Sequence, residues 1–271
     1  IQFGGRLSNF IRLGQKLNTY VNDDPLFYNS ALKIYQGSEP NGKIDYSRGT
    51  VLENFLYLEP RLAFAYQNNS SQSFKVSYNR MAQYLHLISN TNSPTPIDIW
   101  APSGKFIDPQ ILDQFAIGYF KTFNSNRYNL EFEVFHKLIQ NRLDYIDGAE
   151  LIANDAIEQV LLVGEAKARG IELLVRKNEG KLTGWVAYTL SRSKQRTPGR
   201  TSSEVGINNG DWYLTPYDKT HDISITANYG LNKNWDFNAN FLFQTGQPIT
   251  YPEAQYQFMN FSIPNYETRN S

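Results

Sequence analysis

Residues 235–245 read WDFNANFLFQT, the clearest alternation of apolar and polar side chains in the chain. Successive side chains of a β-strand point to opposite faces, so Trp235, Phe237, Ala239, Phe241 and Phe243 would share one apolar face. Residues 222–231 alternate in the same way, and the turn residues 232–234 (Asn-Lys-Asn) favour a tight hairpin between the two segments. The stretch therefore predicts an antiparallel pair of strands with one apolar and one polar face.

The same period of two recurs backwards along the chain. Further strands are predicted around residues 182–191, 171–176, 128–134, 115–119, 74–78, 62–66 and 3–11. We count about nine strands, which predicts an all-β chain. Residues 155–163 (DAIEQVLLV) have helix propensity, but Gly164, Gly170 and the alternation from Ile171 favour a loop followed by a strand, with room for a short loop helix.

The connections between the predicted strands alternate in length. Short turns follow Tyr66, Phe123, Asn178 and Leu231, whereas long polar segments follow Arg12, Ile88, Ile146, Arg196 and Thr250. Outer-membrane barrels have tight periplasmic turns and long extracellular loops. We therefore predict a transmembrane antiparallel up-and-down β-barrel rather than a soluble β-sandwich. Residues 74–88 and 128–146 exceed the thickness of a bilayer and should project above it.

Composition agrees with this fold class and excludes others. The 271 residues contain 26 basic and 26 acidic side chains, and this balance argues against nucleic acid as a partner. The absence of Cys excludes disulfide scaffolds, thiol catalysis and thiolate zinc sites. The mean hydropathy of −0.50 fits barrel strands, because apolar and polar residues alternate along them.

The predicted faces assign roles to two groups of side chains. Aromatic residues on the apolar face near the short turns are expected to form a belt at the membrane interface: Tyr66, Phe74, Tyr119, Tyr128, Tyr229 and Trp235. Polar residues on the other face are expected to line the lumen, where they could follow a ligand path, contact a plug or simply meet water: Glu131, Glu133, Glu172, Arg176, Asp222, Asn238 and Asn240.

The long loops hold the candidate ligand-binding residues. Aromatic and basic side chains in these segments suit the recognition of sugars, peptides, chelates or anionic groups, although they could also pack on one another: Tyr20, Tyr28, Tyr35, Trp100, Arg196, Arg200, Trp212 and Tyr213. The basic residues from Arg192 to Arg200 could also bind lipopolysaccharide phosphates, or form a solvated loop.

Metal and catalytic chemistry are weaker hypotheses. Asp218, His221 and Asp222 are more simply read as hydrogen-bonding residues than as metal ligands, because a ligating set needs three or four converging groups. An esterase needs a Ser and a His within hydrogen-bond reach, and Ser125 and His136 do not share a strand face. We predict no enzyme activity, no metal and no cofactor.

The chain resembles the TonB-dependent outer-membrane receptors of Bacteroidetes from about Leu58 onward. The similarity rests on GIELLVRK at 170–177, GKLTGWVAYTLS at 180–191, INNGDWY at 207–213, YDKTHD at 217–222, FQTGQPIT at 243–250, LEPRLA at 58–63 and residues 77–90. The resemblance implies a bacterial outer-membrane receptor with a 22-stranded barrel and an N-terminal plug, which imports a scarce ligand with energy supplied through TonB.

The resemblance also implies which parts and partners belong to the complete receptor. Residues 1–271 are expected to form part of a single barrel domain from its second half, without the plug and the terminal strands. The implied partners are the plug, TonB, outer-membrane lipid including lipopolysaccharide, and, as a further candidate, a surface lipoprotein. Two alternatives stay open, namely a passive porin-like channel and a surface docking or adhesion barrel without energised transport.

Overall fold

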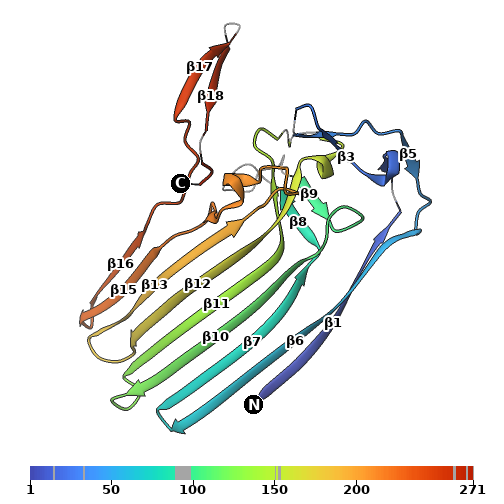
Figure 1. Ribbon diagram of the computed structural model, residues 1–271. Coiled ribbons are helices and arrows are strands. Elements are labelled where there is room, and N and C mark those ends of the chain that lie inside the picture. Colours follow the sequence, from blue (N-terminus) through green and yellow to red (C-terminus); the bar gives the residue numbers. More distant parts are fainter. Residues whose placement is uncertain are drawn as a thin grey trace.

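Nine long strands form one antiparallel sheet in the computed structural model, which describes residues 1–14, 16–32, 34–88, 99–149, 151, 154–258, 261–266 and 268–270 (Figure 1). Each of the nine lies beside the one that precedes it and the one that follows it, which confirms the predicted all-β, up-and-down fold and its strand number. The strands are β1 (Gln2–Leu13), β6 (Val51–Asn69), β7 (Gln72–Gln83), β10 (Gln110–Phe123), β11 (Tyr128–Tyr145), β12 (Leu161–Lys177), β13 (Leu182–Arg196), β15 (His221–Asn232) and β16 (Trp235–Gln244).

The register gives this sheet one apolar and one polar face. One row of directly paired side chains crosses six strands and is entirely apolar: Phe64, Val76, Ile117, Val134, Ile171 and Leu190. Most of these side chains are exposed, as are those in the neighbouring rows of the same face. An uncovered apolar band of this kind faces lipid in outer-membrane barrels. We call this the outward face and the opposite one the inward face.

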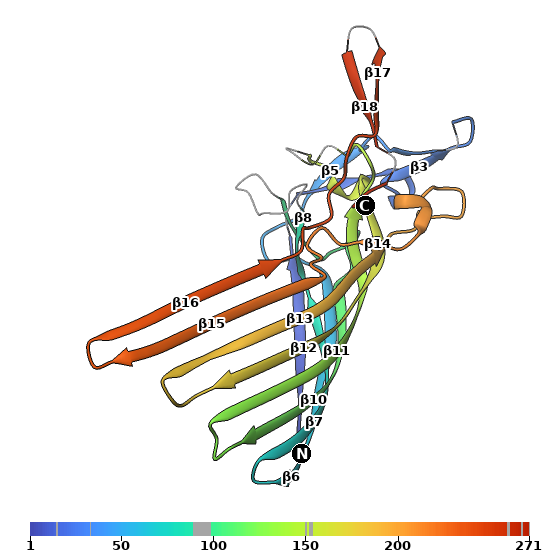
Figure 2. The ribbon, with the colours of Figure 1, turned by 90° about the vertical axis from the view of Figure 1, so that its left-hand side faces the viewer.

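Loop residues fold onto the inward face. The Tyr84 ring stacks on Phe10 of β1 with ring centres 5.1 Å apart, and its hydroxyl lies 2.5 Å from the Ser8 hydroxyl. Ser8 and Phe10 alternate with the outward residues Leu7 and Ile11, so Tyr84 covers the polar side of the sheet. Figure 2 shows how the strands change direction progressively from β1 to β16, as expected for a twisted sheet.

The two ends of the sheet differ as the connection lengths predict. Two- to four-residue turns join β6 to β7, β10 to β11, β12 to β13 and β15 to β16, all at the end that we call the turn end (Figure 1). The turn at 124–127 is tight because Asn124, Ser125 and Asn126 all have positive φ. The opposite end carries the long connections, and we call it the loop end.

Short elements fill the loop end, and among them the sequence pattern leaves room only for a short helical turn within residues 155–163. They are the two-stranded antiparallel sheets β2–β5 (Lys16–Thr19, Gly42–Asp45), β3–β4 (Leu26–Asn29, Ile34–Gly37), β8–β9 (Leu85–Ile88, Ile99–Pro102) and β17–β18 (Ala254–Phe258, Phe261–Asn265), the short strand β14 (Tyr213–Leu214) beside β13, and the 3-10 turns η1 (Val21–Asp23), η2 (Ile157–Gln159) and η3 (Ile207–Gly210).

The buried apolar clusters also lie at the loop end. One contains Ile88, Ala101, Ile107, Leu151 and Leu161, and a second is built around Leu162, Ile207 and Tyr213. Within the described residues, no helix is long and apolar enough to cross a membrane.

Two strand boundaries differ from the sequence prediction. β7 ends at Gln83, and residues 85–88 turn away to pair with β9, so the segment 74–88 is not one projecting strand. β12 begins at Leu161, ten residues before the predicted start at Ile171. The segment with helix propensity holds the 3-10 turn η2 and the first residues of β12, because residues 161–170 pair with the projecting ends of β11 and β13.

A β-bulge at Asn141 changes which residues of β11 face inward. Gln140 pairs with Glu165 and Arg142 pairs with Gly164, so Asn141 is an extra residue between them, and its φ is +55°. Its side-chain amide donates to the Pro109 carbonyl at 2.9 Å. Between the turn end and the bulge, the odd-numbered residues of β11 face inward. Between the bulge and the loop end, Arg142 and Asp144 face inward instead. This switch positions both side chains for the site described next.

Candidate ligand-binding pocket at the loop end

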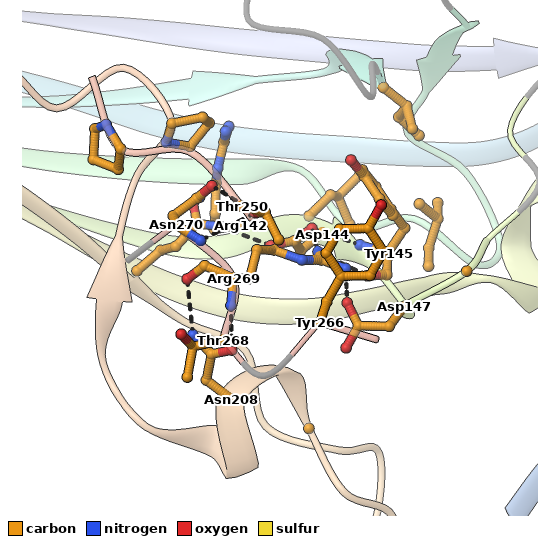
Figure 3. Close-up of a pocket in the computed structure, with 18 of the residues that line it drawn as sticks. Arg142, Asp144, Tyr145, Asp147, Asn208, Thr250, Tyr266, Thr268, Arg269 and Asn270 are labelled. Atoms are coloured by element: carbon orange, nitrogen blue, oxygen red, sulfur yellow. Dashed lines mark hydrogen bonds and ion pairs between the residues drawn. The ribbon is translucent and has the colours of Figure 1, made fainter. Parts of the chain in front are cut away.

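A pocket of about 880 Å³ opens on the inward side of the loop end (Figure 3). The ends of β7, β10, β11 and β13 form its wall together with β8, and residues 205–209, 248–250, 265–266 and 268–270 close around it. Its lining is mainly polar, with Arg142, Asp144, Asn208, Thr250 and Arg269 among the labelled side chains. Converging polar groups in a concave site fix the orientation of a small-molecule ligand and give specificity for it.

Asp144 is the centre of the hydrogen-bond network beneath this pocket. Its carboxylate is buried and accepts from the Tyr213 hydroxyl at 2.5 Å, the Gln195 amide at 2.7 Å and Arg269 at 2.7 Å. Thr197 also contacts the Tyr213 hydroxyl, at 2.8 Å. Burial, followed by the charge of Asp144, raises the pKa of Tyr213, so this phenol stays protonated and keeps donating. The network joins β11, β13 and β14 rigidly.

Arg269 attaches the chain segment 268–270 to the wall of the pocket. Its guanidinium pairs with Asp144 and Asp147, donates to the Tyr145 carbonyl at 3.1 Å, and lies over the Tyr145 ring. Its backbone amide donates to Asn208 at 2.8 Å, and the Asn208 amide donates back to the Arg269 carbonyl at 3.0 Å. The segment therefore forms part of the pocket wall.

Arg142 is the cation of the pocket that has no acidic partner among the described residues. Its Nε is buried without a hydrogen-bond acceptor in this part of the chain. The two carboxylates nearby in the lining, Asp144 and Asp147, are both bound by Arg269. A buried guanidinium nitrogen without an acceptor is costly, so this position favours a ligand that brings an oxygen acceptor or a negative charge.

His86 gives the pocket margin a pH dependence. Its Nε2 lies 3.1 Å from the Ser103 hydroxyl, and the two residues are 4% and 0% exposed. Burial, and then the positive charge of Arg142, lowers the pKa of His86 below its ordinary value of 6.5. The folded state therefore favours the neutral imidazole, and the stability that it contributes is present above pH 6.5 and is lost as the pH falls through the lowered pKa.

We expect β8 and β9 to open more often at pH 5.5 than at pH 7.5. The measurement is hydrogen–deuterium exchange of these strands, expressed as protection factors that remove the intrinsic pH dependence of exchange. His86→Gln keeps a hydrogen-bonding side chain without a titratable group and should show the same protection at both pH values. Equal protection of the native protein at the two pH values would contradict the lowered pKa that we assign to His86 in the folded state.

The first-loop tyrosines make contacts within the loop end. Tyr20 is buried, donates to Glu158 at 2.5 Å and packs against Phe106; burial, then this bond, raises the pKa of Tyr20 to about 12. Tyr28 and Tyr35 pair across β3–β4 with ring centres 5.2 Å apart, and Tyr35 donates to Thr201 at 3.2 Å. Trp100 in β9 is 59% exposed. None of these four lines the pocket.

The remaining predicted ligand-binding residues also lie outside the lining. Arg196 pairs with Glu165 at 2.5 Å and lies over the Trp212 ring on the outward face. Arg200 pairs with Glu204 and donates to the carbonyls of Gln159 and Leu161 at 3.0 and 2.9 Å, so it fixes a loop. Tyr213 supports the pocket through Asp144, as described above. Sequence reasoning missed Arg142 and Asp144 because no motif marks the bulge that turns β11, and it missed Arg269 because Asp144 is 125 positions away in the chain.

The predicted lumen-lining residues all fall on the inward face by register. Glu133 lies directly opposite Glu172, Asn129 opposite Arg176 and Asn228 opposite Asn238. Gln244 donates to Asp222 at 2.7 Å, and Thr226 donates to Asn240 at 2.9 Å. Glu131 faces Leu174 on the same side. Their contact with a ligand or a plug stays a prediction.

The predicted interface aromatics all lie on the outward face towards the turn end. Tyr66 is paired with Phe74, which contacts Tyr119 at 4.9 Å between ring centres. Tyr128 stacks on Phe123, Tyr229 is paired with Phe237, and Trp235 stacks on Phe237. This is the geometry of an interfacial belt, and the membrane role itself stays a prediction.

The residues considered for metal binding have separate hydrogen-bond partners. Asp218 accepts from the Ser193 amide at 2.5 Å, His221 lies 2.9 Å from the Tyr188 hydroxyl, and Asp222 points to the opposite face from His221. In the part of the chain that the structure describes, no three His, Asp or Glu side chains gather as a metal site.

An antiparallel sheet with an outward apolar band, an inward polar wall and a loop-end pocket defines a segment of an outer-membrane-type barrel. The chain belongs to the family of TonB-dependent receptor-like β-barrels: the family model described as "TonB dependent receptor-like, beta-barrel" matches residues 35–270. Barrels of this family belong in general to outer-membrane transport receptors that act with a plug domain and TonB.

A solved structure of the ferric-catecholate import receptor Fiu from E. coli K12, in its closed form, is similar to this chain. The alignment has 16% sequence identity and a TM-score of 0.49, and it covers 87% of this chain. The chain spans 31% of the length of that receptor. The comparison with curated proteins gave no match.

Proposed function

We propose that this chain is part of the barrel of a TonB-dependent receptor that binds a scarce ligand at its loop end and imports it into the periplasm. The observation that carries the proposal is the inward-facing pocket at the end that holds the long loops, in which Arg142 has no acidic partner among the described residues. The sequence motifs support a receptor of the Bacteroidetes type, located in the outer membrane, in which this chain belongs to the second half of a 22-stranded barrel with an N-terminal plug.

The inward wall supports a plug as the internal partner. Glu131, Glu133 and Glu172 form a carboxylate patch towards the turn end of β11 and β12, and no cation pairs with them in the described part of the chain. Like charges placed directly opposite each other in a sheet are destabilising, so Glu133 and Glu172 favour a partner with a complementary basic surface. TonB and a surface lipoprotein over the loop end are further proposed partners.

The pocket favours a polar ligand with at least one anionic group. Arg142 supplies a planar set of donors that suits a carboxylate or phosphate, and Tyr266 and Thr268 in the lining supply neutral groups for hydroxyls. Arg269 is occupied by Asp144 and Asp147, which leaves Arg142 as the cation that would bind the ligand's negative charge.

The test replaces Arg142 in the full-length receptor. Arg142→Gln should weaken ligand binding by about 30-fold or more, because a charge-assisted hydrogen-bonded contact contributes about 2–5 kcal/mol when one partner is removed. Mass spectrometry of ligands that co-purify with the native receptor identifies the compound, and calorimetry then measures both variants. Arg61→Gln removes an inward-facing cation outside the pocket and should bind as the native receptor does. If the Arg142→Gln variant bound the ligand with the native affinity, this pocket would be excluded as the ligand-binding site.

Energised import is tested separately from binding. Uptake by whole cells should stop when the proton gradient is collapsed, because transport through a plugged barrel needs energy delivered by TonB. Uptake that persists would support a passive porin-like channel, whereas binding without any uptake would support a docking or adhesion barrel.

A further inference from the structure

Four basic side chains gather on the outward face of β12 and β13 at the loop end. Arg169 lies directly opposite Arg192, and Lys167 lies directly opposite Lys194 in the next outward-facing position. We call these four residues the basic patch. Cβ atoms of directly opposed residues lie about 5 Å apart, and successive outward positions of one strand about 6.6 Å, so the four side chains can converge on one group.

Little within the protein neutralises this patch. Arg169 and Lys194 have no acidic partner among the described residues, and Lys167 lies over the Trp212 ring at 3.6 Å. Arg192 donates to Thr220 at 2.7 Å and lies 3.8 Å from the buried Asp218. The nearby Arg196 is already paired with Glu165. Two directly opposed like-charged pairs repel each other, so the arrangement favours an external anion.

The patch lies immediately above the apolar band. Ile171 and Leu190, the next outward pair towards the turn end, are apolar and directly paired, and Val134 extends that row onto β11. The outward apolar positions of β13 run from Leu182 to Leu190, which is about 27 Å of strand and, when tilted, most of a hydrocarbon core. The basic patch is therefore at the level where acyl chains meet headgroups.

We propose that the basic patch binds the phosphorylated sugar headgroup of a glycolipid in the outer leaflet. Short turns are periplasmic in such barrels, so the loop end lies at the outer leaflet, and this step rests on the proposed outer-membrane location. Paired Arg side chains suit a phosphate, the adjoining Ile171 and Leu190 contact an acyl chain, and the Trp212 ring lies beside the sugar. A single glycolipid molecule thereby contacts both the basic patch and the adjoining apolar residues.

The experiment measures glycolipid retained by the full-length receptor. The receptor is extracted from outer membranes, washed in neutral detergent and examined by mass spectrometry for bound phosphorylated glycolipid. The Arg169→Gln/Arg192→Gln variant should retain about tenfold less, because charge-assisted hydrogen bonds to phosphate are lost. Both side chains are exposed, and removing a repulsive pair should leave the fold intact.

The matched control is Lys121→Gln/Lys177→Gln, which removes two outward-facing cations of β10 and β12 at the turn end. It should retain as much glycolipid as the native receptor. Equal retention by the Arg169/Arg192 variant, or an equal loss in the control, would overturn the proposal. Displacement of the lipid by millimolar inorganic phosphate would also overturn it, because the site would then recognise free phosphate alone.

The same preparations separate this inference from the proposed import function. Heat-modifiable electrophoretic mobility reports whether the barrel is folded, and uptake by whole cells reports import. Selective loss of glycolipid in the Arg169/Arg192 variant supports the lipid site even if import is absent. A receptor that imports its ligand but retains no glycolipid refutes the lipid site and leaves the import function standing.

Discussion

Asp144→Asn is expected to release the segment 268–270 and to open the pocket without unfolding the sheet. The native carboxylate accepts from Tyr213, Gln195 and Arg269, and its side chain is only 8% exposed. An asparagine amide would direct hydrogens towards these donors and leave Arg269 without its buried counter-charge. Breaking a buried ion pair costs about 3–5 kcal/mol, because it leaves an uncompensated buried charge.

Hydrogen–deuterium exchange of residues 195–215 and 268–270 measures this loss, and ligand affinity measures its effect on the pocket. Asp147→Asn is the matched control, since Asp147 contacts the same Arg269 but its side chain is 76% exposed. Its contribution should be below about 1 kcal/mol, as for other exposed ion pairs. If the two variants behave alike, Asp144 is not the centre of the network.

Gly184→Ala is expected to disrupt the pairing of β13 with β15 and thereby the barrel wall. Gly184 has a φ of +144°, which residues with a Cβ rarely adopt. An added Cβ would also lie 2.0 Å from the Thr226 carbonyl oxygen of the neighbouring strand, and neither backbone can move without breaking the ladder. Backbone strain and overpacking together should cost about 4 kcal/mol.

The measurements are urea unfolding of the full-length receptor in lipid vesicles and the amount that reaches the outer membrane. Gly4→Ala is the control, because Gly4 lies in β1 and an added Cβ there meets no atom within 4 Å. That variant should unfold at the native urea concentration. A Gly184→Ala receptor of native stability would mean that β13 and β15 can separate locally without loss.

The sheet was predictable because its signals are local. Alternation over residues 235–245 and turn chemistry at residues 232–234 each depend on near neighbours, and both hold in the structure. The connection lengths then predict strand order, because a short turn can only join antiparallel neighbours. The early start of β12 was not predictable in this way, since residues 161–170 are ordered by pairing with β11 and β13 rather than by their own pattern.

The pocket depends on contacts between distant parts of the chain, which a single sequence does not reveal. Arg269 meets Asp144 across 125 positions, and Asn208 meets Arg269 across 61. Aromatic and basic loop residues were reasonable candidates by composition, yet Tyr20 and Arg200 use their polar groups to hold the loops together. Composition indicates that a loop can bind something, but it does not distinguish an external ligand from another loop.

The single extra residue at position 141 has a consequence for receptor engineering. Because it exchanges the faces of β11, lipid-facing residues such as Val134 and pocket residues such as Arg142 are both even-numbered although they lie on opposite faces of one strand. A chimera that grafts the end of β11 from another barrel would keep its binding residues in the lumen only if the junction preserves the one-residue shift that the bulge at position 141 introduces. Without this extra residue, the charged side chains of Arg142 and Asp144 would each point to the outside of the barrel, and the graft would lose its pocket while its strands remained paired.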